Sequence, residues 1–261
     1  GRIEIEDLER SIQSDTKLVI LTHASNVLGS ILPVTEISGV LKRHGIPILI
    51  DASQTIGTVP IDVEEMGIDM LAFPGHKGLF GPQGTGALYV REGIELEPFI
   101  HGGTGGRSEI RTQPSEYPER LESGTPNTVG LAGLGAGISF IREIGIDQIR
   151  EKEKGLIRQL WDGLQAIPGV QLLGTENIAD RAGLLSFKLP GISSQELATL
   201  LEQHYQICVR GGLHCAPDAH RFFGEDWLDG AVRASVSWFN KRSDIDALIN
   251  AVKEIADVFV K

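Results

Sequence analysis

The N-terminal part of the chain alternates short apolar runs with polar or amphipathic segments. Four apolar runs, at residues 17–22, 47–50, 69–73 and 86–90, predict β-strands. Residues 33–44 have the spacing of an amphipathic helix that starts at a proline and stops at a glycine. A short helix or turn is expected between the second and third strands. This alternation indicates an α/β unit with a mostly parallel sheet and helices on both faces.

The middle of the chain loses its regular periodicity. Residues 95–127 contain the glycine-rich run 101–106 and two prolines, and they predict a long loop. Loops of this length usually carry function or cover an interface. Residues 129–144 then predict a closely packed helix rich in glycine and alanine. A more charged helix follows over residues 147–166, with Asp147 as its candidate N-cap.

The pattern changes again beyond Pro168, where strands and helices no longer alternate regularly. Helices are predicted at residues 194–204, capped by Ser193, and at residues 243–260. Strands are predicted at residues 170–173, 184–189, 206–209 and 232–236. This order is typical of an α+β unit. We therefore place a domain boundary near Gly145, which divides the chain into a large domain, 1–145, and a small one, 146–261.

Composition narrows the class of protein. The 261 residues are enough for one or two domains with a substantial core, and 41% of them are hydrophobic. The net charge of -11 leaves no basic footprint for nucleic acid or for a membrane surface, and no apolar stretch is long enough to span a bilayer. Two cysteines make no disulfide framework, which favours a reducing, cytoplasmic setting.

Chemically active side chains follow three of the predicted strands. Asn26 comes after the first strand, Asp51 ends the second, and Lys77 follows the third within a glycine-flanked turn. In open α/β sheets, ligands bind beyond the carboxyl ends of the strands. Desolvation there would lower the pKa of Lys77 and make its amine a nucleophile toward an aldehyde cofactor. Asp51 could keep a ring nitrogen protonated, and Gln54 could donate to a ring oxygen.

Two further candidates lie in the C-terminal part. Arg233 interrupts an apolar strand, so it needs a partner, and a substrate carboxylate would serve. Cys215 lies in a glycine-rich loop, where the neighbouring His214 and Arg210 would favour its thiolate; Cys208 we assign to core packing. Each candidate has an ordinary alternative, such as a surface lysine, a capping aspartate, a loop cysteine or a structural ion pair.

Metal and dinucleotide sites are not indicated. The seven histidines are scattered, and no compact His/Cys ligand spacing appears, so we expect no metal. The glycines of residues 81–86 lack the Gly-x-Gly-x-x-Gly spacing of a dinucleotide fingerprint.

Taken together, the motifs resemble the class V aminotransferase family of pyridoxal-phosphate enzymes, and within it the cysteine desulfurase and selenocysteine lyase group. They run in family order across nearly the whole chain. The matching segments are Thr22–Gly29, Asp51–Gln54, Gly75–Lys77, Glu122–Asn127, Arg210–Pro217 and Arg233–Ser235. The resemblance implies the aspartate-aminotransferase-like fold, which is fold type I of these enzymes, with a mostly parallel large domain and a small α+β domain.

The resemblance also implies how the cofactor is held. Lys77 would form the Schiff base with pyridoxal 5'-phosphate and later act as the base at the substrate Cα. Asp51 would pair with the pyridine nitrogen, Gln54 and Asn26 would contact the ring-oxygen side, and His76 would help to hold the phosphate.

The remaining roles concern substrate and partners. Thr125 would reach the phosphate of a partner subunit's cofactor, which implies a homodimer. Arg233 would bind the carboxylate of L-cysteine, and Cys215 would take the sulfur as a persulfide, release alanine and pass the sulfur to an acceptor protein. The alternatives are an aminotransferase or another lyase of the same family, including selenocysteine lyase, which would not need Cys215, and a truncated, inactive dimerising chain.

Two departures from the family pattern stand out. Pro74 occupies a position where the family usually has a hydroxyl residue, and proline offers no hydrogen bond to a phosphate. The family's N-terminal segment, with its phosphate turn and the ring that stacks on the cofactor, has no counterpart before Gly1. We therefore expect this chain to be a fragment of a longer enzyme.

Overall fold

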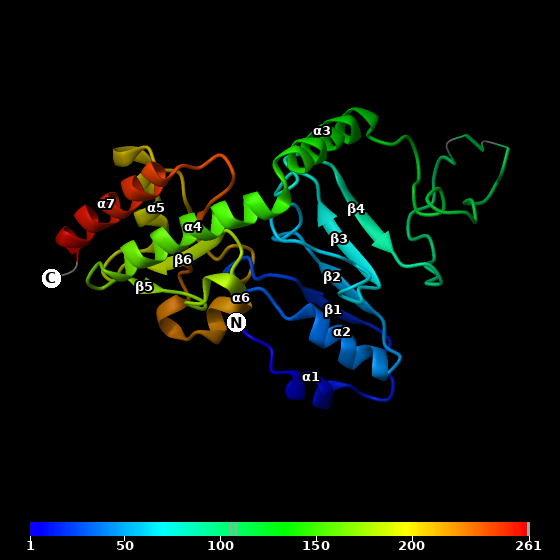
Figure 1. Cartoon of the computed structure of the whole chain (residues 1–261), viewed down its shortest axis with the longest axis horizontal. Coiled ribbons are helices and arrows are strands. Elements are labelled where there is room, and N and C mark those ends of the chain that lie inside the picture. The colour runs from blue at the N-terminus through cyan, green and yellow to red at the C-terminus, as the bar shows by residue number, and fades with distance from the viewer. Residues whose placement is uncertain (105, 108, 260–261) are drawn as a thin grey trace.

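In a computed structural model, which describes residues 1–104, 106–107 and 109–259, the chain forms two units side by side (Figure 1). The first unit is built on a sheet whose order, among the described residues, is β1-β2-β3-β4. Its strands are β1 (Val19–Thr22), β2 (Ile48–Asp51), β3 (Met70–Pro74) and β4 (Gly86–Val90). The first three run parallel and β4 is antiparallel to β3, so the prediction of a mostly parallel sheet is confirmed.

Helices cover one face of this first sheet. The helices α1 (Ile5–Ser11), which we did not predict, and α2 (Val34–Arg43) pack against the apolar residues of that face. On the opposite face, Ile20 is 63% exposed and Leu88 is 44% exposed. The expectation of helices on both faces is therefore wrong for the described residues. Only the connection from β1 to β2 contains a crossover helix, whereas residues 52–69 cross from β2 to β3 through turns.

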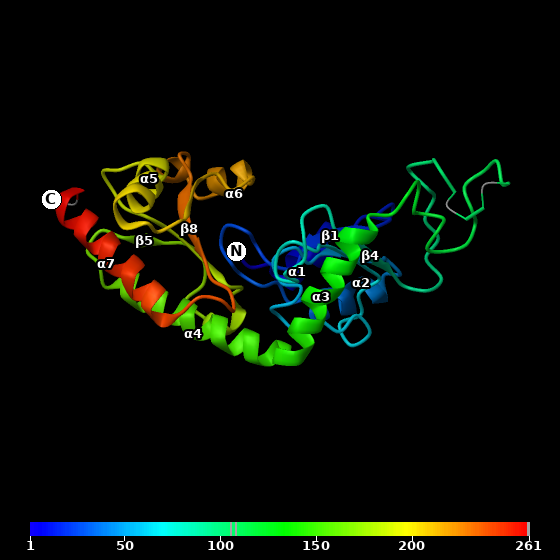
Figure 2. The ribbon, with the colours of Figure 1, turned by 90° about the horizontal axis from the view of Figure 1, so that it is seen from above.

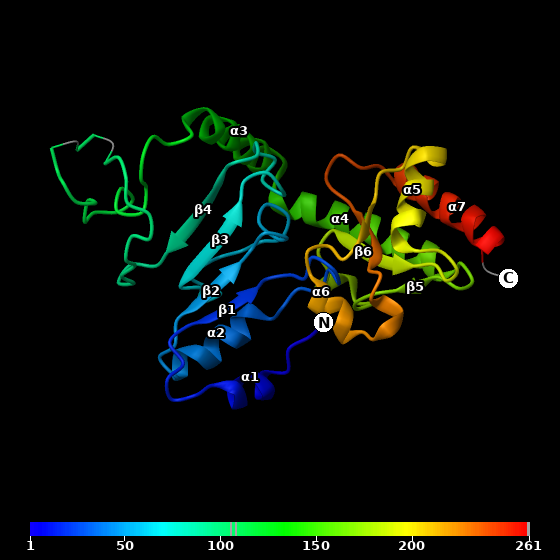
Figure 3. The ribbon, with the colours of Figure 1, turned by 180° about the vertical axis from the view of Figure 1, so that it is seen from behind.

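The two units are joined by a long loop and a bent pair of helices. Described residues between β4 and α3 (Thr128–Ile144) contain neither helix nor strand, as predicted, and Figure 3 shows this segment extending away from the sheet. After α3 the chain turns by 81° into α4 (Ile146–Gln165). Gly145, with φ 91°, is the N-cap of α4. The expected cap, Asp147, lies instead in the first turn, and the domain boundary near Gly145 stays a prediction.

Among the helices of the described ranges, none taken alone is both long and apolar enough to cross a bilayer. The bent pair α3 and α4 would be long and apolar enough only when the two helices are taken together, by length and composition alone.

The second unit has an antiparallel sheet of order β5-β6-β8-β7 in the described residues. Its strands are β5 (Gln171–Leu172), β6 (Leu184–Lys188), β7 (Arg210–Gly212) and β8 (Ala231–Ser235). The strand expected at residues 206–209 is wrong, because pairing begins only at the first residue of β7. Cys208 consequently lies on an exposed connection, and its assignment to core packing is also wrong.

Helices cover one face of the second sheet. The helices α4, α5 (Ser194–Tyr205) and α7 (Arg242–Phe259) enclose a core with Leu185, Phe187, Val232 and Ala234 of the central strands. The predicted cap of α5 is confirmed, since Ser193 Oγ accepts a hydrogen bond from the backbone N–H of the third helical residue. Three short helices were not predicted. They are the 3-10 helices η1 (Ile178–Asp180) and η2 (Glu225–Trp227), and α6 (Pro217–Phe222).

The opposite face of the second sheet is turned toward the first unit. Residues alternate between faces along a strand, so Ser186 and its cross-strand partner Arg233 point away from the helices. Ser186 Oγ donates to the backbone carbonyl of Val27 at 2.5 Å, and the Ala182 N–H donates to the carbonyl of Gly29 at 2.7 Å. The loop after β1 therefore joins the two units, which Figure 2 shows from above.

Candidate active site

A cavity of about 450 Å³ lies where the two units meet. Its walls take residues from the ends of β1, β2 and β3, from α4, from β8 and from the loop after β7. The predicted site residues that line it are Asn26, Gln54, Lys77, Cys215 and Arg233. Two larger hollows lie elsewhere, one along the 97–120 loop and one beside α4, and none of the predicted site residues lines them.

Lys77 follows β3 in a tight turn. The N–H of Phe80 donates to the carbonyl of Lys77 at 3.0 Å, and the N–H of Gly81 donates to the carbonyl of Gly75 at 2.8 Å. Partial burial in the cavity lowers the pKa of Lys77, and the nearby Asp51 carboxylate opposes this shift. The cations Arg233 and Arg210 lower the pKa further. The site thus increases the fraction of the neutral, nucleophilic amine.

Asp51 is the last residue of β2 and lies close enough to Lys77 to affect its charge. Its Oδ1 accepts a hydrogen bond from the N–H of Ser53 at 2.8 Å, which orients the carboxylate at the end of the strand. Asp51 is absent from the residues that line the cavity. Asp51 therefore acts on the pKa of Lys77 as a nearby negative charge, without being part of the cavity lining.

Asn26 connects the two halves of the cavity. Its side-chain Nδ2 donates to the carbonyl of His214 at 2.6 Å, and its own carbonyl accepts from Nη1 of Arg233 at 2.9 Å. The ring-oxygen contact that the family resemblance implies for Asn26 stays a prediction. The structure adds a contact to the loop that carries Cys215.

Arg233 presents donors to the cavity. Its Nε lies buried without a hydrogen-bond partner among the described residues, and burial lowers the pKa of its guanidinium, with Arg210 adding to the effect. An unpaired buried N–H costs free energy unless an acceptor reaches it. A carboxylate accepts such donors in pairs, so this position suits the carboxylate of an amino acid.

Cys215 lies in a strained turn after β7. His214 and Cys215 have φ values of 53° and 62°, in the left-handed region that residues other than glycine rarely adopt. The turn is preceded by Gly212, whose φ of 106° excludes most side chains. Nη2 of Arg210 lies 3.3 Å from Sγ of Cys215 and donates to it. The exposed sulfur is therefore held beside a cation at the cavity wall.

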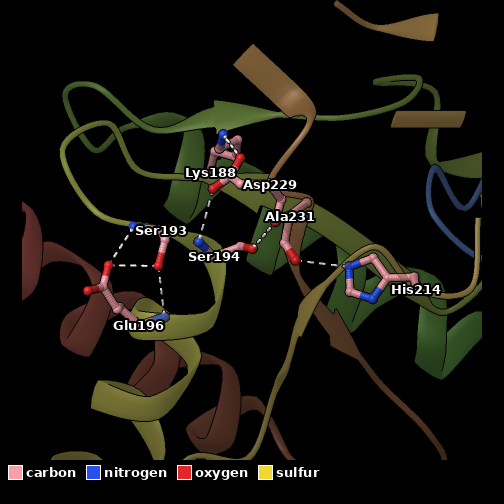
Figure 4. A network of polar contacts seen from close by, with 7 residues as sticks. All are labelled: Lys188, Ser193, Ser194, Glu196, His214, Asp229 and Ala231. Atoms are coloured by element: carbon pink, nitrogen blue, oxygen red, sulfur yellow. Dashed lines mark hydrogen bonds and ion pairs between the residues drawn. The ribbon is translucent and has the colours of Figure 1, made fainter. Parts of the chain in front are cut away.

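His214 does not act on Cys215 as the sequence suggested. Its Nε2–H donates to the carbonyl of Ala231 at 2.9 Å, so this side of the ring faces β8 (Figure 4). Burial lowers the pKa of His214 to about 4, with Arg233 contributing next, and the ring is neutral near pH 7. A neutral imidazole gives no cationic support to a thiolate. Of the two neighbours, only Arg210 places a positive charge beside the sulfur.

Besides Asp51, two further predicted site residues lie outside the cavity lining. His76 is exposed beside Lys77, and Thr125 is exposed in the loop that leads into α3. Neither lines the cavity wall. The roles proposed for both residues, which concern the cofactor phosphate, stay predictions.

Glu153 is a cavity residue that sequence reasoning missed. It is 2% exposed on α4, and burial raises its pKa to about 8 against the opposing effect of Arg150. A signal was present, because Glu153 falls on the apolar stripe of α4 together with Ile149 and Ile157. A carboxyl group in that position is buried when the helix packs.

Comparison with known proteins agrees with the motifs. The family model "Aminotransferase class-V" matches residues 1–248. A probable cysteine desulfurase of Pyrococcus abyssi is 36% identical, over 98% of this chain and 63% of its own length. A cysteine desulfurase of Serratia proteamaculans is 34% identical, over 98% of this chain and 62% of its own length.

Solved structures give the same result. An apo cysteine desulfurase from Thermococcus onnurineus superposes with a TM-score of 0.87 at 33% identity, over 99% of this chain and 64% of that one. A cysteine desulfurase from Escherichia coli gives 0.86 at 29% identity, over 98% of this chain and 63% of that one. The predicted fold class is confirmed, and the chain spans just under two thirds of these relatives' lengths. By its motifs, its fold and its match over residues 1–248, the chain belongs to the aminotransferase class-V family.

Proposed function

We propose that this chain carries the active site of a pyridoxal-phosphate-dependent cysteine desulfurase. The observation that supports this most is the shared cavity, whose wall includes an amine, a guanidinium and a thiol at Lys77, Arg233 and Cys215. The relatives named above, desulfurases by name, support the same reaction. An aminotransferase would have no need of the thiol.

Pyridoxal phosphate is the cofactor of class-V enzymes, and the residues present fit it. When bound, it supplies an aldehyde that condenses with amines and a ring that accepts electrons from a substrate carbon. Lys77 offers an amine whose pKa is lowered by burial, and Asp51 places a negative charge nearby. Gln54 and Asn26 line the same cavity with amide groups that could meet the ring substituents.

The chain's own residues then have distinct tasks with L-cysteine. Arg233 binds the substrate carboxylate through the guanidinium that it contributes to the cavity wall, and Lys77 takes the proton from Cα. The Cys215 thiolate attacks the substrate sulfur, so an S–S bond forms as the C–S bond breaks. The electron pair of the broken bond stays with Cβ, which takes up a proton, and Lys77 returns a proton to Cα before the product leaves as L-alanine. The sulfur remains on Cys215 as a persulfide.

The proposal extends to partners and location. Cys215 is exposed, as transfer of its sulfur to an acceptor protein requires. A second copy of the chain in a homodimer would cover apolar residues near Thr125, where Val129 is 85% exposed and Leu131 is 46% exposed. Both cysteines are free, which agrees with the reducing cytoplasm that a thiol nucleophile needs.

A pair of cysteine variants in the holoenzyme tests the function. Cys215→Ala should abolish alanine release from L-cysteine while the cofactor absorbance band remains, and Cys208→Ala should leave both unchanged. Lys77→Ala should lose the band that borohydride converts into a lysine adduct. Unchanged turnover in Cys215→Ala, or turnover that requires a keto acid as amino acceptor, would replace desulfuration by transamination. A chain that never binds the cofactor would be the inactive alternative.

A further inference from the structure

Three phenylalanines from separate segments form a cluster, named here the aromatic joint. The ring of Phe80 lies 5.9 Å from that of Phe140 and 5.1 Å from that of Phe239, in edge-to-face geometry. Phe140 and Phe239 are stacked, with centroids 6.0 Å apart. Aromatic pairs at these distances attract one another beyond the area that they bury. The joint therefore ties the Lys77 turn, α3 and the loop between β8 and α7 together.

Phe80 belongs to the turn that carries Lys77. Its N–H donates to the Lys77 carbonyl at 3.0 Å, its φ of 56° is left-handed, and the residue lines the cavity. A residue held in an unfavourable backbone conformation depends on its surroundings to stay there. The ring contacts of Phe80 therefore also bear on the position of Lys77.

Phe239 belongs to the second unit and is anchored there by its neighbour. Nζ of Lys152 on α4 lies 4.5 Å from the ring centroid of Trp238 and also donates to its carbonyl. Ser237, two residues before Phe239, lines the cavity that also contains Arg233 and Cys215. Phe239 is 62% exposed, so burial in a core does not account for its position.

The reacting groups belong to the two units that this joint connects. Lys77 is in the first unit, while Arg233 and Cys215 are in the second. The loop after β1 joins the second unit to the end of β1, and the aromatic joint connects the second unit to the Lys77 turn. A displacement of about 1 Å between reacting groups is enough to slow an enzyme about a hundredfold.

We propose that the aromatic joint sets the position of Lys77 relative to Arg233 and Cys215, and that Phe239 is a positioning residue for sulfur transfer. This rests on the proposed function, because sulfur transfer is the step that needs both sides of the cavity at once. Phe239 is not among the residues that line the cavity, and it acts through the ring of Phe80.

The test compares Phe239→Leu with Phe239→Tyr and with Phe222→Leu in the holoenzyme. Phe222 is a matched control, because it is an 84% exposed phenylalanine of the second unit whose ring contacts only Phe223 among the described rings. Phe239→Leu should slow persulfide formation on Cys215 about tenfold, which corresponds to the loss of two aromatic pairs. It should also speed amide hydrogen exchange in residues 75–81. Phe239→Tyr keeps the aromatic ring, so both the rate of persulfide formation and the rate of amide exchange should stay at their wild-type values. Phe222→Leu should change neither rate.

A double-mutant cycle with Phe80→Leu completes the test, since Phe239→Leu should add nothing once Phe80 is gone. Additive effects would overturn the proposal, and so would a Phe239→Leu chain that behaves like Phe222→Leu. Faster exchange across the whole second unit, instead of the Lys77 turn, would make Phe239 merely structural and would also overturn it. Hydrogen exchange needs no turnover, so it decides the positioning role even if desulfuration is not the reaction.

Discussion

Nη2 of Arg210 donates a hydrogen bond to Sγ of Cys215 across 3.3 Å. Arg210 begins β7, and the Gly211–Gly212 pair lets the chain fold back so that the guanidinium meets the thiol five residues later. This contact orients the sulfur and places a positive charge beside it. The segment that carries Cys215 thus also supplies the guanidinium that contacts its sulfur.

Replacing Arg210 by glutamine should reduce the reactivity of Cys215. Hydrogen bonds to charged groups contribute about 1.5–3 kcal/mol, so alkylation of Cys215 by iodoacetamide at pH 7 should slow at least about tenfold. Mass spectrometry of the two cysteine peptides measures this rate, with the exposed Cys208 as internal reference. Arg221→Gln serves as control, because the ion-pair partner of Arg221 among the described residues is Asp218 in the same segment. Equal rates in all three chains would remove the role assigned to Arg210.

Two glycines of α3 should respond to alanine in opposite ways. A Cβ at Gly137 would lie 2.2 Å from the carbonyl oxygen of Leu79, in the turn that carries Lys77. Gly137→Ala must push α3 away from that turn, and overpacking of this kind costs about 1–3 kcal/mol of unfolding free energy. Gly135 has open space around its Cβ position, so Gly135→Ala should stabilise the helix by about 0.5–1 kcal/mol. Denaturant unfolding measures both, and a shift of the same sign in both variants would contradict the packing described for α3.

Much of the site could be predicted because its residues interrupt regular patterns. Asp51 and Lys77 follow apolar runs, and in a parallel sheet the ends of such runs meet at one edge. Arg233 alternates with Val232 and Ala234, so period two places it on the face opposite the helices. These inferences need only local sequence and the rules of sheet geometry.

The rest depended on contacts that sequence does not display. The direction of His214 follows from its left-handed backbone and from the Ala231 carbonyl in another strand. Strand β7 consists of Arg210 and two glycines, and glycine is depleted in strands. The sequence pattern therefore favoured a strand over the apolar residues before β7. Glu153 was overlooked because α4 as a whole is strongly charged. In each case tertiary packing outweighed the local preference.

The buried His214 should make the protein less stable in acid. Its pKa is about 4 in the folded chain against 6.5 for an ordinary histidine, so the unfolded chain binds more protons between these values. Its contribution is therefore present above pH 6.5 and is lost as the pH falls toward 4, by as much as about 3 kcal/mol. The unfolding free energy of wild type should therefore fall relative to that of His214→Gln as the pH decreases from 6.5 to 4. His204→Gln, at an exposed position on α5, should show no such trend.

Glu153 should produce the opposite dependence on pH. Burial raises its pKa from 4.5 to about 8, so the folded chain holds a proton that the unfolded chain has released between these values. The stabilising contribution is present below pH 4.5 and falls as the pH rises to 8, with a slope on the order of 1 kcal/mol per pH unit. Glu153→Gln mimics the protonated group and should therefore gain stability over wild type as the pH rises.

The matched control for this prediction is Glu151→Gln, an exposed position on the same helix. Between pH 4.5 and 6.5, His214 and Glu153 change the unfolding free energy in opposite directions as the pH rises. The pH dependence of wild-type stability alone would therefore conceal both contributions. The useful quantity is the difference between each variant and wild type, measured by urea unfolding at half-unit steps from pH 4 to 9. A Glu153→Gln difference that stays flat over this range, as for Glu151→Gln, would mean that Glu153 is ionised in the folded chain. The cavity would then carry one more negative charge beside α4 than described above.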